Sequence, residues 1–204
     1  MKMLRYHDIT KSDMKNGSGL RTVLWVAGCN HHCKGCQNPI TWDPEGGLLF
    51  DAEAEKELFD ELDKDYCSGL TLSGGDPLYP DNRFAIALLL EKFRDRYGYA
   101  GDKTVWIYTG YTMDELKNQM YDDAELWRIM YDADVIVDGP YIEEQRDTSR
   151  YWVGSDNQII WICDGIKPDL ALPIGYVPRY IPQPKEYLKS LSEEQHEKEK
   201  GCDC

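Results

Sequence analysis

The sequence predicts an α/β fold with about five or six mostly parallel strands, built either as a partial (β/α) barrel or as an open sheet. Short apolar runs alternate with helical patterns along the chain, as they do in βαβ units with right-handed crossovers. The chain has 204 residues, enough for one domain with a sizeable core. It has too few such units for a closed eight-stranded barrel, which takes ~250 residues.

The first half of the chain contains two predicted strands, each followed by a glycine, and a helix between them. Residues 21–27 have the β-branched and aromatic composition of a buried strand, which ends at Gly28. Residues 51–65 form a helical pattern with Asp51 as the N-cap and acidic residues in the first turn. Residues 69–73 form the second short strand, which ends at a pair of glycines.

The second half continues the alternation. A helix is expected over residues 80–97 and a strand over 104–109. Thr112 and Glu115 have the spacing of a capping box, which opens a third helical region that can break near residues 122–123. Further strands are expected at 134–137 and 158–162.

The composition excludes several classes of protein. The formal net charge of −14 removes the electrostatic attraction that binding to nucleic acid or to an anionic membrane requires. The N-terminus has no apolar targeting segment and no later run approaches bilayer length, so a soluble, cytoplasmic protein is expected. Seven cysteines, three of them within eight positions, favour reduced metal-binding thiols over a disulfide framework.

The composition changes after residue 163. Half of the ten prolines lie between Pro168 and Pro184, and the chain is then nearly all polar and charged up to Cys202 and Cys204. We therefore expect one domain over residues 1–163, followed over 164–204 by an extended, proline-rich arm and a mobile tail.

The most informative motif is the loop that follows the first predicted strand. Cys29, Cys33 and Cys36 are spaced as C-x3-C-x2-C. Three thiolates can hold three irons of a cubane iron–sulfur cluster and leave the fourth iron open to a small molecule. Zinc is the alternative metal, with His31 or His32 as a fourth ligand, although both histidines are expected to face solvent.

Further motifs follow the other predicted strands. Residues 73–77 read Ser-Gly-Gly-Asp-Pro, which fits either a tight turn or a backbone that a ligand approaches closely. Residues 109–111 and 138–140 follow the next two strands. Because the carboxyl ends of parallel strands share one edge of a sheet, we expect all four motifs to converge there.

These motifs resemble those of the radical S-adenosylmethionine superfamily. Within it, the chain is similar to the activating proteins of anaerobic (class III) ribonucleotide reductase. Gly35 stands where most of the superfamily has an aromatic residue, as it does in this branch. The matching stretches are residues 16–21, 28–38, 72–78, 106–111, 137–139 and 154–158.

The resemblance implies a partial barrel of the radical S-adenosylmethionine type. It implies that Cys29, Cys33 and Cys36 hold a [4Fe–4S] cluster whose open iron binds S-adenosyl-L-methionine. The main chain around Gly35, Cys36 and Gln37 would meet the adenosine part of this cofactor. Gly74, Gly75 and Asp76 would meet its methionine amino group.

The implied activity is that of an oxidoreductase. Reductive cleavage of S-adenosylmethionine would give a 5′-deoxyadenosyl radical, which takes a hydrogen atom from a glycine on the large subunit of the reductase. A flavodoxin or ferredoxin would supply the electron. Three alternatives stay open: an activase of another glycyl-radical enzyme, a radical enzyme acting on a small molecule, and a non-catalytic zinc module.

The polar composition of the tail predicts that it is dispensable for metal binding. A chain truncated after Lys189 should keep its iron and its ability to cleave S-adenosylmethionine, measured by iron analysis and by release of 5′-deoxyadenosine. Loss of either property would show that Cys202 and Cys204 take part.

Overall fold

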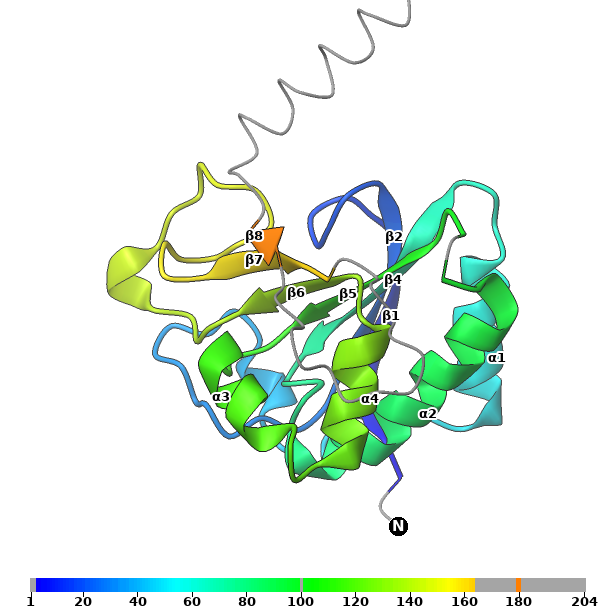
Figure 1. Cartoon of the computed structure of the whole chain (residues 1–204), viewed down its shortest axis with the longest axis horizontal. Helices are drawn as coiled ribbons and strands as arrows, with labels where there is room; N and C mark the ends of the chain where they lie inside the picture. Colours follow the sequence, from blue (N-terminus) through cyan, green and yellow to red (C-terminus); the bar gives the residue numbers. More distant parts are fainter. Residues whose placement is uncertain (1–2, 100, 164–178, 181–204) are drawn as a thin grey trace, which may run out of the picture.

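The centre of the molecule is an open eight-stranded sheet in the order β3-β1-β2-β4-β5-β6-β7-β8 (Figure 1). The computed structural model describes residues 3–99 and 101–163, together with the backbone of 179–180. Four neighbouring strands in the middle of the sheet are parallel, which confirms the predicted α/β class. They are β2 (Leu20–Val26), β4 (Cys67–Gly74), β5 (Thr104–Tyr108) and β6 (Val135–Asp138).

Both outer parts of the sheet are antiparallel. They are built from β1 (Arg5–Asp13), β3 (Leu48–Leu49), β7 (Ile159–Ile162) and β8 (Arg179–Tyr180). Three neighbouring pairs are parallel and four are antiparallel, so the prediction of about five or six mostly parallel strands was wrong in number and direction.

The extra strands have a common physical cause. The chain turns back from β1 to β2 and from β6 to β7 without a crossover helix, and such a return gives antiparallel pairing. Polar residues dominate β1, since one side of this strand is exposed along much of its length. Its two buried apolar residues, Tyr6 and Ile9, were therefore too few to indicate a strand from the sequence.

The four helices lie where the sequence predicts them. They are α1 (Ala52–Leu62), α2 (Pro80–Tyr97), α3 (Met113–Gln119) and α4 (Ala124–Asp132). The Asp51 carboxylate caps α1 by accepting hydrogen bonds from the backbone N–H groups of Glu53 and Ala54, both at 3.0 Å. The predicted capping box of Thr112 and Glu115 opens α3.

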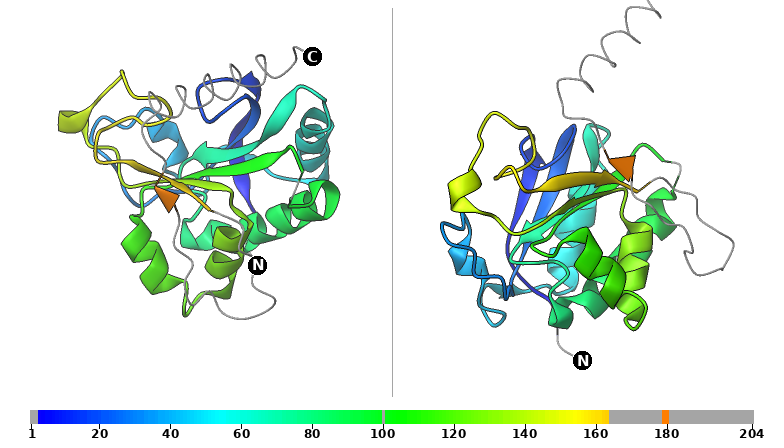
Figure 2. Two further views of the ribbon diagram at one scale, coloured as in Figure 1. Left: turned by 45° about the horizontal axis from the view of Figure 1, so that its top comes forward. Right: turned by 60° about the vertical axis from the view of Figure 1, so that its left-hand side comes forward.

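All four helices cover the same face of the sheet, and loops cover the other face (Figure 2). The strand residues that point toward the helices, such as Leu24, Leu70 and Ile107, belong to the main apolar core. On the opposite face, a smaller cluster around Trp106 and Val137 packs against the loop of residues 139–158. A sheet covered by helices on one face only leaves its other face available to form a cavity.

Arg21 is the largest fully buried side chain and links three strands on the loop-covered face. Its guanidinium donates hydrogen bonds to the Thr71 hydroxyl at 2.7 Å and to the Leu70 and Thr104 carbonyls at 2.6 Å. Burial lowers the pKa of Arg21 to about 10, so it remains charged at neutral pH. The glycine-rich segment before β2 packs on this side chain, since a Cβ at Gly17 would lie 2.6 Å from Arg21 Cδ.

Among the described residues, no helix combines the length and the apolar character needed to cross a bilayer. The arm and tail predicted over 164–204 lie outside the described residues, apart from the two residues of β8. Cys202 and Cys204 are therefore not placed. Cys67 and Cys163 are buried in the core.

Replacing Arg21 by Met should lower the free energy of unfolding by about 2–4 kcal/mol, because buried carbonyls of β4 and β5 lose their donors. Urea denaturation would measure this loss. Arg128→Met is the matched control, since Arg128 makes an exposed ion pair with Glu91, and its effect should stay within about 0.5 kcal/mol. Equal effects of the two variants would contradict the structural role of Arg21.

Candidate functional site

A cavity of about 880 Å³ lies at the carboxyl ends of the parallel strands. It is lined by residues from all four motifs that follow β2, β4, β5 and β6, so the predicted convergence of these motifs is observed. The lining residues from the motifs are Cys29, His31, Cys33, Cys36, Ser73, Gly74, Gly75, Thr109, Gly110 and Gly139.

The cysteine loop is anchored at both ends. At its start, the N–H groups of Gly28 and Cys29 donate hydrogen bonds to the carbonyls of Thr41 and Trp42, at 2.8 and 3.1 Å. At its end, the 3-10 helix Pro39–Thr41 turns the chain back toward β2. Between these anchors, all three thiols are partly exposed and face the cavity.

Two of the thiols, those of Cys29 and Cys33, are protonated at neutral pH when no metal is bound. Burial raises the pKa of Cys29 to about 11 and also raises that of Cys33. Metal binding must therefore displace protons from these sulfurs. Among the described residues, no three His, Cys, Asp or Glu side chains surround a single ion site; the three thiols share a cavity instead. Three cysteine sulfurs on one side of a cavity suit a cluster, which spreads its thiolates over separate irons.

Gly35 lies where another loop packs against the cysteine loop. Its φ is +73°, and an added Cβ would lie 2.1 Å from the Glu143 carboxylate, in the 3-10 helix Glu143–Gln145. Lys34 also forms an ion pair at 2.8 Å with Glu144 of the same turn. An aromatic residue at position 35 would have to adopt a left-handed backbone and displace the Glu143 side chain. Gln37 is exposed and lines the cavity.

Gly74 and Gly75 line the cavity, but the need for glycine comes from backbone packing. A Cβ at Gly75 would lie 2.4 Å from the Gly28 carbonyl oxygen and 2.7 Å from that of Thr41. At Gly74, where φ is +107°, a Cβ would lie 2.7 Å from the backbone of Val26. A larger residue would thus displace the base of the cysteine loop. Both glycines are thus needed for packing at this turn, and the approach of a ligand to their backbone stays a prediction.

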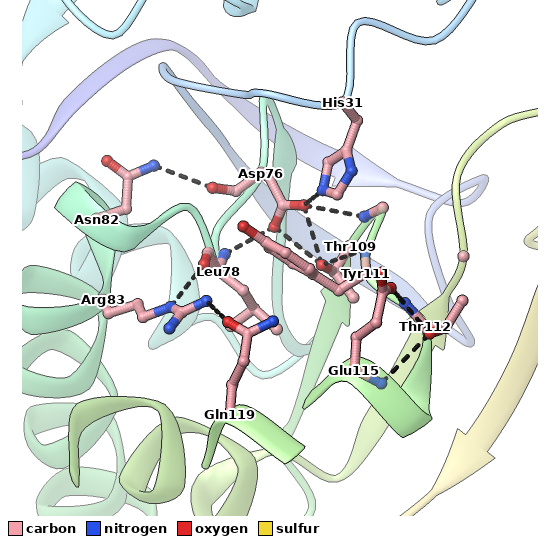
Figure 3. Close-up of polar contacts among 12 residues, drawn as sticks. His31, Asp76, Leu78, Asn82, Arg83, Thr109, Tyr111, Thr112, Glu115 and Gln119 are labelled. Carbon is pink, nitrogen blue, oxygen red and sulfur yellow. Dashed lines mark hydrogen bonds and ion pairs between the residues drawn. The ribbon is translucent and has the colours of Figure 1, made fainter. Parts of the chain in front are cut away.

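The Asp76 side chain is completely buried and joins three loops (Figure 3). One carboxylate oxygen accepts hydrogen bonds from His31 Nε2 at 2.7 Å and from the Gly110 N–H at 2.9 Å. The other accepts from the Leu78 N–H at 2.8 Å, and the Thr109 hydroxyl lies 3.0 Å from both oxygens. The predicted cofactor residue Asp76 is thus a junction between the cysteine loop, its own turn and the end of β5.

His31 does not face solvent, so that prediction was wrong. Its side chain is 17% exposed and points to Asp76, with the Tyr111 ring edge-on at 4.6 Å (Figure 3). His32 is exposed, as predicted, and contacts the ring of Trp42. The partner of His31 is 45 positions away in the sequence, so the spacing within the loop gave no indication of this contact.

The residues that support this junction could not be predicted from the sequence. The Asn82 amide donates hydrogen bonds to the carbonyls of Ala27 and Asp76, at 2.9 and 3.0 Å. The Arg83 guanidinium bonds Leu78 and Gln119 and lies 5.7 Å from the centre of the Tyr111 ring (Figure 3). Both residues lie in the first turn of α2, where the sequence predicted a helix and no polar contacts.

The sequence also did not predict that residues 141–153 contribute much of the cavity wall. Tyr141, Arg146, Tyr151 and Trp152 line the cavity from this side. Their density of aromatic and basic residues in a stretch with no helical pattern was the available signal.

The α/β fold and the three thiols that face its cavity are those of an iron–sulfur protein, and comparison with known proteins agrees. Residues 15–161 match the family model of the 4Fe-4S single cluster domain. This match includes the three cysteines and every strand that contributes a motif to the cavity.

Three curated relatives indicate which family of iron–sulfur proteins the chain resembles. Each is named anaerobic ribonucleoside-triphosphate reductase-activating protein. The chain is 42% identical to that of Enterobacteria phage T4 over 80% of its own length, and 39% and 40% identical to those of Vibrio cholerae and Haemophilus influenzae over 77% and 78%. The alignments cover 97% of each relative. The chain belongs to the family of anaerobic ribonucleoside-triphosphate reductase-activating proteins.

Replacing Asp76 by Asn should lower the free energy of unfolding by about 1–3 kcal/mol, because the new amide N–H₂ must face a backbone N–H, that of Leu78 or of Gly110, in either orientation. Thermal and urea unfolding of the metal-free chain would measure the loss. Asp65→Asn, at an exposed position, is the control and should change stability by less than about 0.5 kcal/mol. Full stability of the Asp76 variant would show that its charge is not needed at this junction.

Proposed function

We propose that this protein cleaves S-adenosyl-L-methionine reductively at a [4Fe–4S] cluster and thereby generates a glycyl radical on the large subunit of anaerobic ribonucleotide reductase. The observation that carries the proposal is the cavity into which Cys29, Cys33 and Cys36 all face. The names of the relatives support the same partner. The open sheet, with helices on one face and this cavity at its strand ends, suits a partial barrel of the radical S-adenosylmethionine type.

The cofactors would carry out the chemical steps, and one electron is used for each cleavage. A cluster held by Cys29, Cys33 and Cys36 would supply the one electron needed to break the C–S bond of the S-adenosylmethionine sulfonium, with methionine and a 5′-deoxyadenosyl radical as the products. A hydrogen atom moves from the glycine Cα to this radical, leaving 5′-deoxyadenosine and the glycyl radical. A flavodoxin or ferredoxin would return one electron for each cleavage.

The chain's own residues would hold and enclose these groups. Cys29, Cys33 and Cys36 would each bind one iron. Of the three cofactor residues predicted at the β4 turn, Gly74 and Gly75 line the cavity, whereas the Asp76 carboxylate is buried and already bonded. We therefore expect the cofactor's amino group to meet the main chain of the two glycines. The main chain from Gly35 to Gln37 remains our proposal for the adenosine contact, and Gln37 lines the cavity.

The acidic charge of the chain suits a protein substrate in the cytoplasm better than a nucleic acid. We assign the reaction to the domain of residues 1–163, which contains every described residue of the cavity wall. The arm and tail over 164–204 would then be accessory.

Anaerobic reconstitution with iron and sulfide should load about four irons per chain. Cys33→Ala should abolish this loading, because one of the three thiolates is lost. Cys67→Ala is the matched control: Cys67 is buried on β4 and does not line the cavity, so this variant should load iron normally. Iron analysis and visible absorption would measure both. Normal iron loading in Cys33→Ala, or stoichiometric zinc in place of iron, would contradict the cluster.

The activity itself has a direct spectroscopic test. The loaded protein, mixed with the reductase large subunit, S-adenosylmethionine and a strong one-electron reductant, should give an electron paramagnetic resonance doublet. The doublet arises because the unpaired electron couples to the single remaining glycine Cα hydrogen. It should disappear with Cys36→Ala. Cofactor cleavage and turnover of a small molecule, with no radical on the reductase, would instead favour a small-molecule enzyme.

A further inference from the structure

His31 occupies a slot whose three sides come from different parts of the chain. The Asp76 carboxylate accepts a hydrogen bond from its Nε2 atom at 2.7 Å. The Tyr111 ring lies edge-on at 4.6 Å between ring centres. On the third side is Gly110, where an added Cβ would lie 2.4 Å from His31 Cδ2. The absence of a side chain at position 110 makes room for the imidazole.

The slot is rigid because each of its sides is fixed by further contacts. Asp76 accepts hydrogen bonds from backbone and hydroxyl donors on two strand ends. Tyr111 is backed by the Arg83 guanidinium, whose own partners on α3 and at the start of α4 are Gln119 and Asp123. A buried carboxylate with four donors and a closely packed ring both resist displacement.

The contact between His31 and Asp76 affects the thiols because His31 lies within the cysteine loop. His31 lies between Cys29 and Cys33, two residues from each. Other described contacts of the loop lie at its base, through Gly28, Cys29 and Thr41, and on its far side, where Lys34 pairs with Glu144 and the Tyr141 main chain bonds Cys33. A side chain fixed between Cys29 and Cys33 therefore restrains the segment that lies between these two sets of contacts.

We infer that His31 is a positioning residue: its imidazole, locked between Asp76, Gly110 and Tyr111, holds the cysteine loop in a metal-ready conformation before any cluster is bound. The three thiols then face the cavity without the metal having to order the loop. This pre-organisation differs from that of small metal domains whose folding depends on the ion.

Three variants of the full chain separate this role from a general effect on the loop. His31→Ala empties the slot, and Asp76 keeps its donors from Leu78, Thr109 and Gly110, so the fold should survive. Gly110→Ala closes the slot without changing the loop sequence, and Gly110 does not have the left-handed backbone that would disfavour alanine. His32→Ala is the control, because His32 is exposed and adjacent to His31 in the same loop.

Hydrogen exchange of the metal-free chain, read by mass spectrometry over residues 28–38, tests the inference without any cluster. Exchange should accelerate roughly tenfold in His31→Ala and Gly110→Ala, the factor expected from losing one hydrogen bond to a charged group. It should be unchanged in His32→Ala and, in all variants, over the β4 and β5 core. Unchanged exchange in both slot variants, or equal acceleration in His32→Ala, would overturn the inference.

A second measurement uses the chain reconstituted with iron and sulfide. The visible circular dichroism of the cluster should change in the two slot variants, and loss of iron to a chelator should become faster, while His32→Ala should match the wild type. A wild-type chain that takes up no iron would contradict the proposed function and leave the exchange result to decide the role of His31. Identical spectra and rates in all four chains would count against the positioning role.

Discussion

The buried carboxylate of Asp76 is the interaction on which the site depends. A carboxylate removed from water must be compensated by hydrogen bonds or by an opposite charge, and here the donors come from three separate loops. Satisfying this one charge therefore places the cysteine loop, the β4 turn and the end of β5 at fixed distances from one another. The Asn82 amide bonds the Asp76 carbonyl and the end of β2, which ties the same junction to α2.

Close packing at the glycines around this junction also fixes the relative positions of the loops. Gly75 allows the β4 turn to approach the base of the cysteine loop, Gly110 admits the His31 ring, and Gly35 admits Glu143. In each case the space that a side chain would fill is occupied by protein atoms. These glycines therefore bring loops together, and the cavity is what the assembled loops leave between them.

The face of the sheet opposite the helices gives the site its room. The helices bury one face in the main core, whereas the described residues on the other face form a small apolar cluster, the buried Arg21 side chain and loops. Hydrogen bonds from the Arg21 guanidinium to neighbouring strands replace some of the apolar packing that a second layer of helices would supply. The thiols can then face a cavity that is open to a cofactor and a substrate.

The central βαβ order, the positions of the described helices, the caps of α1 and α3, and the meeting of four motifs at one edge of the sheet could all be predicted from the sequence, because they follow from local periodicity, capping residues and the geometry of parallel strands. The remaining features depend on contacts between distant segments. The antiparallel outer strands depend on how the chain returns. The contact of His31 with Asp76, the burial of Arg21 and the reason for each glycine depend on which distant segments pack together, and the spacing of residues along a chain does not record such contacts.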